Sequence, residues 1–179
     1  MPAESFGGSI PVFVDVGDDF SMVVTSDGAL YGCGMNNNCQ LGLGDHVIAK
    51  FMKRVGDTGK SKGQRVRSVR CGSVHSMILT EDNTLWACGL SMDPLCGISA
   101  SRVAAIYAKV PARIRHARFH DNDVILFAAG VSHSAAITSK GELYTWGEGV
   151  CYTRSPSSVP LGITTHTSSG FHGRSLHPP

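Results

Sequence analysis

The sequence predicts an all-β protein built from three similar sheet units, and two observations lead to this prediction. A block of eighteen residues occurs three times without internal gaps, beginning at Gly17, Gly72 and Gly130, so the copies are 55 and 58 residues apart. Apolar residues in each copy alternate with period two, as in β-strands, and no stretch carries a convincing apolar stripe at helical spacing. A repeat of roughly 50 residues is typical of propeller blades or of a solenoid.

The first expected strand of each unit ends one residue before the block. One face of this segment is apolar in every copy, where its residues are Val14 and Val16, Val69 and Cys71, and Phe127 and Ala129. Side chains two positions apart on a strand point to the same face of the sheet. We therefore expect Val14, Val69 and Phe127 to occupy equivalent buried positions.

A second and a third strand are expected inside each block. The second strand follows from continuous apolar runs, which suit a strand covered on both faces: Met22–Val24, Met77–Leu79 and Ala135–Ile137. The next residues tolerate positive φ and predict a tight hairpin turn: Asp27-Gly28, Asp82-Asn83 and Lys140-Gly141. The third strand begins at an apolar-aromatic pair: Leu30-Tyr31, Leu85-Trp86 or Leu143-Tyr144.

The third copy carries the most distinctive residues: Gly130-Val131-Ser132-His133-Ser134, Thr138, Gly141, Leu143-Tyr144 and Trp146-Gly147. This pattern resembles the repeat of the regulator of chromosome condensation family, and Cys39-Gln40-Leu41-Gly42 resembles that family's Gly-Gln-Leu-Gly turn. The segment Val110–Ile114 is similar to the Pro-x-x-Val strand that follows the turn. The resemblance covers about residues 12–150. It implies a partial β-propeller of about three four-stranded blades, incomplete relative to the family's seven-bladed ring.

Several positions depart from the family pattern. The first copy has Phe20 in place of His, Cys33 and Cys88 replace the Trp kept at Trp146, and Asn83 replaces a glycine. These changes are conservative in size or turn geometry, so we expect the fold to survive them.

The resemblance ends after Gly149, where the family's turn sequence is absent. We accordingly expect three propeller-type repeats in residues 1–154. Residues 155–179 form a tail rich in Ser, Thr, Pro and His that is either disordered or truncated.

Composition places the chain inside the cell. The first residues lack the charged and apolar regions of a signal peptide, and no segment has the roughly 18 apolar residues of a membrane helix. The six cysteines include three at core-type repeat positions, which indicates buried thiols in a reducing compartment. We expect an intracellular protein, cytoplasmic or nuclear, without a membrane partner.

Two motifs that suggest catalysis have stronger structural interpretations. Gly59-Lys60-Ser61 looks like the end of a phosphate-binding loop, but Arg54 stands where that motif needs a glycine. The pairs His75-Ser76 and His133-Ser134 suggest a nucleophile and a base. Neighbouring side chains on an extended chain point to opposite faces, however, so a hydrogen-bonded structural role is favoured. We expect no catalytic residues, no cofactor and no enzyme activity.

Metal binding is also disfavoured. Cys71 and His75 have tolerable ligand spacing, as do Cys33 and Cys39, but no second Cys-x-x-Cys pair completes a tetrahedral set. Because Cys71 occupies the repeat position of Val16 and Ala129, core packing is favoured over zinc.

Basic residues concentrate between positions 50 and 70. This segment holds eight of the sixteen Lys and Arg residues and one acid, Asp57, for a net charge of +7 where the whole chain carries +2. Such asymmetry favours an acidic partner, although a solvated loop without a partner is an alternative. The candidate patch consists of Lys50, Lys53, Arg54, Lys60, Lys62, Arg65, Arg67 and Arg70.

Two classes of function follow from these features. The first is a non-catalytic protein-interaction module. The alternative, implied by the family resemblance, is an exchange factor or regulator for a small GTPase, with an association with chromatin or nucleic acid as a weaker expectation. Open ends of a repeat stack expose apolar faces, so we also expect self-association or pairing with further blades, through strands such as Met22–Val24 or Ala135–Ile137.

Overall fold

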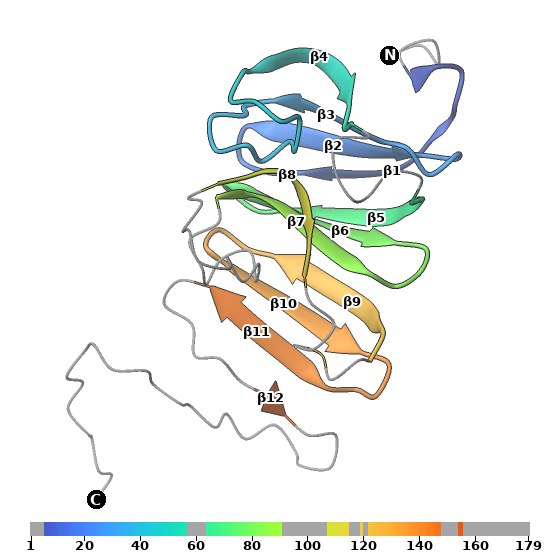
Figure 1. Ribbon diagram of the computed structural model, residues 1–179, viewed down its shortest axis with the longest axis vertical. Helices are drawn as coiled ribbons and strands as arrows, with labels where there is room; N and C mark the ends of the chain where they lie inside the picture. Colours follow the sequence, from blue (N-terminus) through green and yellow to red (C-terminus); the bar gives the residue numbers. More distant parts are fainter. Residues whose placement is uncertain are drawn as a thin grey trace, which may run out of the picture.

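The computed structural model describes residues 6–56, 64–90, 107–114, 119, 122–147 and 154–155. The described strands form three four-stranded antiparallel sheets, which are stacked along the long axis of the molecule (Figure 1). Blade 1 contains β1 (Pro11–Val16), β2 (Phe20–Thr25), β3 (Leu30–Gly34) and β4 (Ala49–Arg54). Blade 2 contains β5 (Val66–Cys71), β6 (His75–Thr80), β7 (Leu85–Leu90) and β8 (Tyr107–Arg113). Blade 3 contains β9 (Val124–Ala129), β10 (His133–Thr138), β11 (Leu143–Gly147) and β12 (Arg154–Ser155).

The strands of each blade are paired in chain order. The first strands of the three blades, β1, β5 and β9, contact one another in succession and form one edge of the stack, whereas β4 lies at the other edge of blade 1. This arrangement is that of consecutive propeller blades. It confirms the predicted all-β, partial-propeller fold.

The hairpin turns have the predicted backbone conformation. Gly28, Asn83 and Gly141 adopt φ values of 77°, 58° and 75°. The repeated threonine fixes this turn, because the single hydroxyl proton of Thr25 lies between two acceptors, Asp27 Oδ1 at 2.6 Å and the Ala29 carbonyl oxygen at 3.0 Å from Oγ1. The hydrogen bond from Thr25 lowers the pKa of the Asp27 carboxyl, so the aspartate stays ionised and continues to accept this bond.

Two apolar clusters hold the blades together. The first joins blades 1 and 2 and includes Met22, Val24, Val69 and Trp86. The second joins blades 2 and 3 and includes Met77, Leu79, Ala136 and Trp146. Both faces of blade 2 are therefore buried, which explains the uninterrupted apolar run in β6.

The expectation of equivalent burial is correct at Val69 and wrong at Val14. Val69 is fully buried and Phe127 packs partly buried against the second cluster, but Val14 is 62% exposed. The reason is position in the stack, because none of the described blades packs on this face of blade 1. The expectation that Met22–Val24 would be exposed is likewise wrong, because Met22 and Val24 face blade 2 and the exposed valines of blade 1 lie on β1.

The first glycine of each block allows the blades to approach closely. A Cβ atom at Gly72 would lie 2.5 Å from the Gly130 carbonyl oxygen of the next blade and 2.5 Å from the His75 ring. A Cβ at Gly17 would meet the Gly72 carbonyl oxygen at 2.4 Å in the same way. The requirement for glycine is thus steric and arises between blades.

Within the described residues, no helix is both long enough and apolar enough to cross a membrane.

We predict that Gly72→Val destabilises the protein by more than about 1 kcal/mol, because the new side chain meets a backbone carbonyl that cannot move alone. Thermal and urea unfolding measure the effect. Gly130→Val is the matched control, since the atoms nearest to a Cβ at Gly130 belong to the exposed ring of His133, at 2.7 Å. Equal losses in Gly72→Val and Gly130→Val would contradict the role of the blade-to-blade approach.

Candidate protein-interaction site

The repeated histidine of blade 2, His75, connects this blade to blade 3. His75 lies at the start of β6, is fully buried, and places its Nε2 atom 2.9 Å from the Ser134 hydroxyl of blade 3. Its Nδ1 atom has no hydrogen-bond partner in the part of the chain that the structure describes. Although the pair joins a serine to a histidine, Ser134 is also fully buried, so no substrate can reach its hydroxyl. The buried position of His75 and its contact with Ser134 therefore fit the hydrogen-bonded structural role that the sequence favours.

Burial lowers the pKa of His75 to about 4, with the charge of His133 as the second cause. The imidazole is therefore neutral in the folded protein near pH 7. Below the ordinary histidine pKa of 6.5, the unfolded chain binds a proton that the folded chain excludes. Stability must then fall as pH decreases.

We predict a loss of stability between about pH 6.5 and pH 4, by at most about 3 kcal/mol from this group. Urea unfolding across this range measures it. His75→Phe places at this position the residue that blade 1 has there, Phe20, and should remove this part of the pH dependence. An unchanged pH profile in His75→Phe would show that another group is responsible.

The cysteines in the described residues are buried or half-buried thiols. Burial raises the pKa of Cys71 to about 12, with the Asp15 carboxylate adding to the effect, and the thiol packs in the first apolar cluster. Cys39 Sγ lies 3.3 Å from His46 Nδ1. No group of three metal-ligating side chains occurs in the described part of the chain.

The predicted basic patch divides into residues with different roles. Three of its members lie on β4, the edge strand of blade 1, and their side chains are exposed: Lys50, Lys53 and Arg54. Among the described residues, none of these three forms an ion pair. Lys60 and Lys62 lie outside the described residues.

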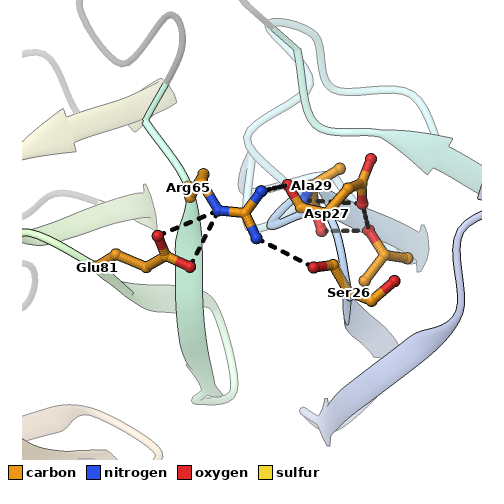
Figure 2. A network of polar contacts seen from close by, with 6 residues as sticks. Ser26, Asp27, Ala29, Arg65 and Glu81 are labelled. Atoms are coloured by element: carbon orange, nitrogen blue, oxygen red, sulfur yellow. Dashed lines mark hydrogen bonds and ion pairs between the residues drawn. The ribbon is translucent and has the colours of Figure 1, made fainter.

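Arg65 is committed to contacts inside the protein (Figure 2). Its Nε atom lies 3.0 Å from Glu81 Oε1 in the hairpin of blade 2, and its two terminal nitrogens donate to the carbonyls of Asp27 and Ser26 at 2.8 and 3.1 Å. The side chain therefore ties the hairpin of blade 1 to that of blade 2. Gly28 makes room for it, because a Cβ there would lie 2.7 Å from Arg65 Cβ.

Arg70 is also engaged. Its guanidinium carbon lies 5.0 Å from the ring centre of Phe13 in blade 1 and 5.7 Å from that of Phe127 in blade 3. This cation–π contact links all three blades at their inner edge. Arg67 is exposed on β5 and makes one long hydrogen bond, of 3.4 Å, to Asn83 Oδ1.

Sequence reasoning missed the apolar component of the β4 surface. Phe51 is 76% exposed between Lys50 and Met52, and Val47 and Ile48 just before the strand are 59% and 50% exposed. We call the group Val47, Ile48, Lys50, Phe51, Lys53 and Arg54 the β4 strip. The mixture of apolar and basic residues at 47–54 could have indicated it, but only the structure shows that β4 is an edge strand.

A cavity of about 150 Å³ lies beside the strip, between blades 1 and 2. Its lining includes Arg54, Arg65 and the ring of Trp86. The Trp86 Nε1 atom is buried and has no hydrogen-bond acceptor among the described residues.

We predict that Arg65→Lys lowers the free energy of unfolding by about 1 kcal/mol, because an ammonium group cannot reproduce the two carbonyl contacts and the Glu81 contact together. The exposed ion pair by itself contributes little. Thermal unfolding of Arg65→Lys measures the effect. Arg67→Lys is the control, since Arg67 makes one long hydrogen bond. Equal melting temperatures in the two variants would show that Arg65 does not link the hairpins of blades 1 and 2.

The four-stranded blades are stacked on one another, with repeated glycines and serines between the blades and repeated threonines in the hairpin turns. This architecture is that of a propeller repeat protein. The model of the regulator of chromosome condensation (RCC1) repeat matches residues 27–79, and a second model of the same repeat matches residues 12–40 and 124–152. Together these matches span more than half of the sequence. The chain belongs to the RCC1 repeat family.

The relatives that this chain matches are longer than it is. It is 31% identical over 172 residues to the RCC1 domain-containing protein RUG3, mitochondrial, of Arabidopsis thaliana, covering 96% of this chain and 37% of that protein. It is 31% identical over 161 residues to the secretion-regulating guanine nucleotide exchange factor of Mus musculus, covering 88% of this chain and 33% of that protein. The chain therefore spans about a third of the length of these relatives.

The fold agrees with a solved structure of similar architecture. Human WBSCR16 superposes with a TM-score of 0.69 at 25% sequence identity, over 84% of this chain and 36% of that protein. The likeness supports the blade arrangement described above.

Proposed function

We propose that this chain is a non-catalytic protein-interaction module whose β4 strip contacts an acidic segment of a partner protein. One observation carries the proposal: a single edge strand combines a phenylalanine that is 76% exposed with three exposed cations that form no ion pair within the described residues. Aromatic anchors supply most of the energy of protein interfaces. Surrounding charges steer the partner and fix its register.

The strip also has features that protect an edge strand from pairing. Lysines on an edge and a bulge in the ladder both discourage the addition of another strand, and the pairing of β3 with β4 shifts between Gly32 and Gly34. We infer that the partner contacts the side chains of the strip and does not extend the sheet. The exposed guanidinium of Arg54 favours carboxylates, because its fork of N–H donors matches them in geometry.

We predict that the combined change Lys50→Glu, Lys53→Glu and Arg54→Glu weakens binding of the acidic partner at least about tenfold at low salt. Added salt should weaken the wild type more than the variant, because exposed charges are screened over about 10 Å. Titration calorimetry at two ionic strengths measures both effects. For a single-residue comparison, Lys53→Glu should weaken binding of the partner. Lys140→Glu, on the hairpin of blade 3, should leave binding unchanged.

The partner itself can be found by site-specific crosslinking. A photoreactive phenylalanine at Phe51 should capture a protein through an acidic segment, and the same group at Lys140 should not capture that protein. Equal capture from both positions, or equal salt dependence in the wild type and the triple variant, would remove the strip from the interface.

The second candidate function is regulation of a small GTPase, including nucleotide exchange. The name of the mouse relative supports it, since that protein is called a guanine nucleotide exchange factor. Exchange requires tighter binding to the nucleotide-free GTPase than to the loaded one. Release of a fluorescent guanine nucleotide from a panel of small GTPases decides between the two functions: accelerated release favours exchange, and binding without release favours the module.

We propose an intracellular location, with the mitochondrion added to the cytoplasm and nucleus because the Arabidopsis relative is named as mitochondrial. Association with chromatin or nucleic acid stays a prediction. Fractionation of cells with an antibody to this chain tests the location.

A further inference from the structure

The cavity between blades 1 and 2 can be compared with the joint between blades 2 and 3, because the repeat places equivalent strands on both sides of each joint. The cavity has a volume of about 150 Å³. Five apolar residues that are buried or half-buried form what we call the cavity floor: Leu30, Val55, Val66, Ile78 and Trp86.

Each residue of the cavity floor has a counterpart in the next joint. Equivalent backbone hydrogen bonds and strand register identify the counterparts, which are, in the same order, Leu85, Ile114, Val124, Ala136 and Tyr144. For example, the Val55 N–H donates to the Leu30 carbonyl in the same way as the Ile114 N–H donates to the carbonyl of Leu85. The two sets of residues therefore surround the same place in their joints.

An aromatic ring fills this place between blades 2 and 3. The five counterparts belong to, or pack against, the apolar cluster that contains Phe119. Phe119 is 2% exposed and packs edge-to-face on Tyr144, with ring centres 5.2 Å apart. Phe6 packs on Tyr31 of blade 1 in the same way, also at 5.2 Å. The aromatic residue of the third strand thus receives a second ring in blades 1 and 3.

The sequence of blade 2 differs at the position of this second ring. Phe6 and Phe119 each precede the first glycine of their block by eleven residues, and Ser61 stands at the same distance before Gly72. Ser61 lies outside the described residues, but a serine is too small to occupy the volume of a benzene ring. An engineered apolar cavity of about 150 Å³ takes up benzene. The cavity on Trp86 therefore has the place and the size for one aromatic ring.

The rim of the cavity is polar. Its exposed lining residues are Asp27, Arg54, Gln64 and Arg65. Arg65 is held by Glu81 and by two hairpin carbonyls (Figure 2), and Gln64 donates to Asp82 at 2.9 Å.

Arg54 is the rim cation that is available to a ligand, because it forms no ion pair with any other described residue. In the floor, Trp86 is 4% exposed, and its Nε1 atom has no acceptor in the described part of the chain. A guanidinium group and an indole N–H are both hydrogen-bond donors. A ligand that matches them carries acceptor oxygens and, beside Arg54, a negative charge.

We propose that this cavity binds a small aromatic carboxylate, a compound with one six-membered ring and one carboxylate group. The ring occupies the place that Phe119 has in the neighbouring joint and packs on the indole of Trp86. The carboxylate lies at the rim and accepts hydrogen bonds from the Arg54 guanidinium, whose fork of donors fits a carboxylate. The proposal does not depend on the protein partner of the β4 strip, since the ligand lies between the blades.

Titration with benzoate, followed through the indole N–H signals in ¹⁵N–¹H NMR spectra, tests the proposal. The chain has two tryptophans, and of these Trp86 lines the cavity. Its signal should shift and reach saturation, whereas the signal of Trp146 should stay in place, and a Trp146→Phe variant assigns the two signals. Acetate, which has the charge without the ring, should shift neither. The absence of a saturable Trp86 shift with benzoate overturns the proposal, and so does an equal shift with acetate.

The carboxylate contact is tested by Arg54→Gln. This variant should bind benzoate at least about fivefold more weakly, the loss expected for one charge-assisted hydrogen bond. Lys53→Gln is the matched control, because it removes the same charge from the neighbouring residue, which does not line the cavity, and it should bind benzoate like the wild type. Equal weakening in both variants would indicate attraction by net charge and would contradict a specific site.

The place of the ring is tested by Val66→Phe. Val66 is half-buried at the start of β5 and lines the cavity, so a phenylalanine there should fill the space and abolish benzoate binding. Thermal unfolding shows whether the variant is folded, and unchanged benzoate binding by the folded variant would place the ligand elsewhere and overturn the proposal. Lys53→Gln also separates this site from the β4 strip, since it should weaken binding of the protein partner and leave benzoate binding intact.

Discussion

The structure depends on the close face-to-face packing of one blade on the next. Apolar side chains supply the driving force, and Met22 and Met77 at the centres of the two clusters are fully buried. Their packing is possible because the first glycine of one blade lies directly against the backbone carbonyl of the next. A side chain at that point would hold the sheets apart and cost the contacts of the whole joint. The glycines of the repeat are therefore tertiary features, although they recur as a local pattern.

Polar groups fix the direction and spacing of this packing. Ser76 donates its hydroxyl proton to the Gln40 carbonyl of blade 1 at 2.7 Å, and Ser134 meets His75 of blade 2. Both serines are fully buried, so each has its hydrogen-bonding capacity used where water is absent. Because blade 1 offers Phe20 in place of a histidine, its joint with blade 2 uses the loop carbonyl of Gln40 instead. The same scaffold thus accepts a histidine or a phenylalanine at one position.

Basic residues that are neighbours in sequence serve three separate purposes in space. Arg65 joins the hairpins of two blades, and Arg70 lies between aromatic rings at the inner edge. Lys50, Lys53 and Arg54 are exposed on the outer strand of blade 1 and form no ion pair with any other described residue. In the proposed function, interaction and stability are therefore carried by different members of one charged segment, and a change in one group is expected to leave the other intact.

The sequence by itself determined the number of sheets, the hairpins and the alternation within strands, because these depend on contacts between residues close in the chain. Thr25, Asp27 and Gly28 form their turn among themselves, and the repeat shows the pattern three times. The packing partner of each sheet face was decided only by the tertiary structure. Val14 and Val69 are indistinguishable in the repeat, yet one is exposed and the other buried. The same holds for Arg65 and Lys53: net charge marks the segment, but the distance to Glu81 or to an open edge depends on how blades 1 and 2 are stacked, and no local pattern contains that information.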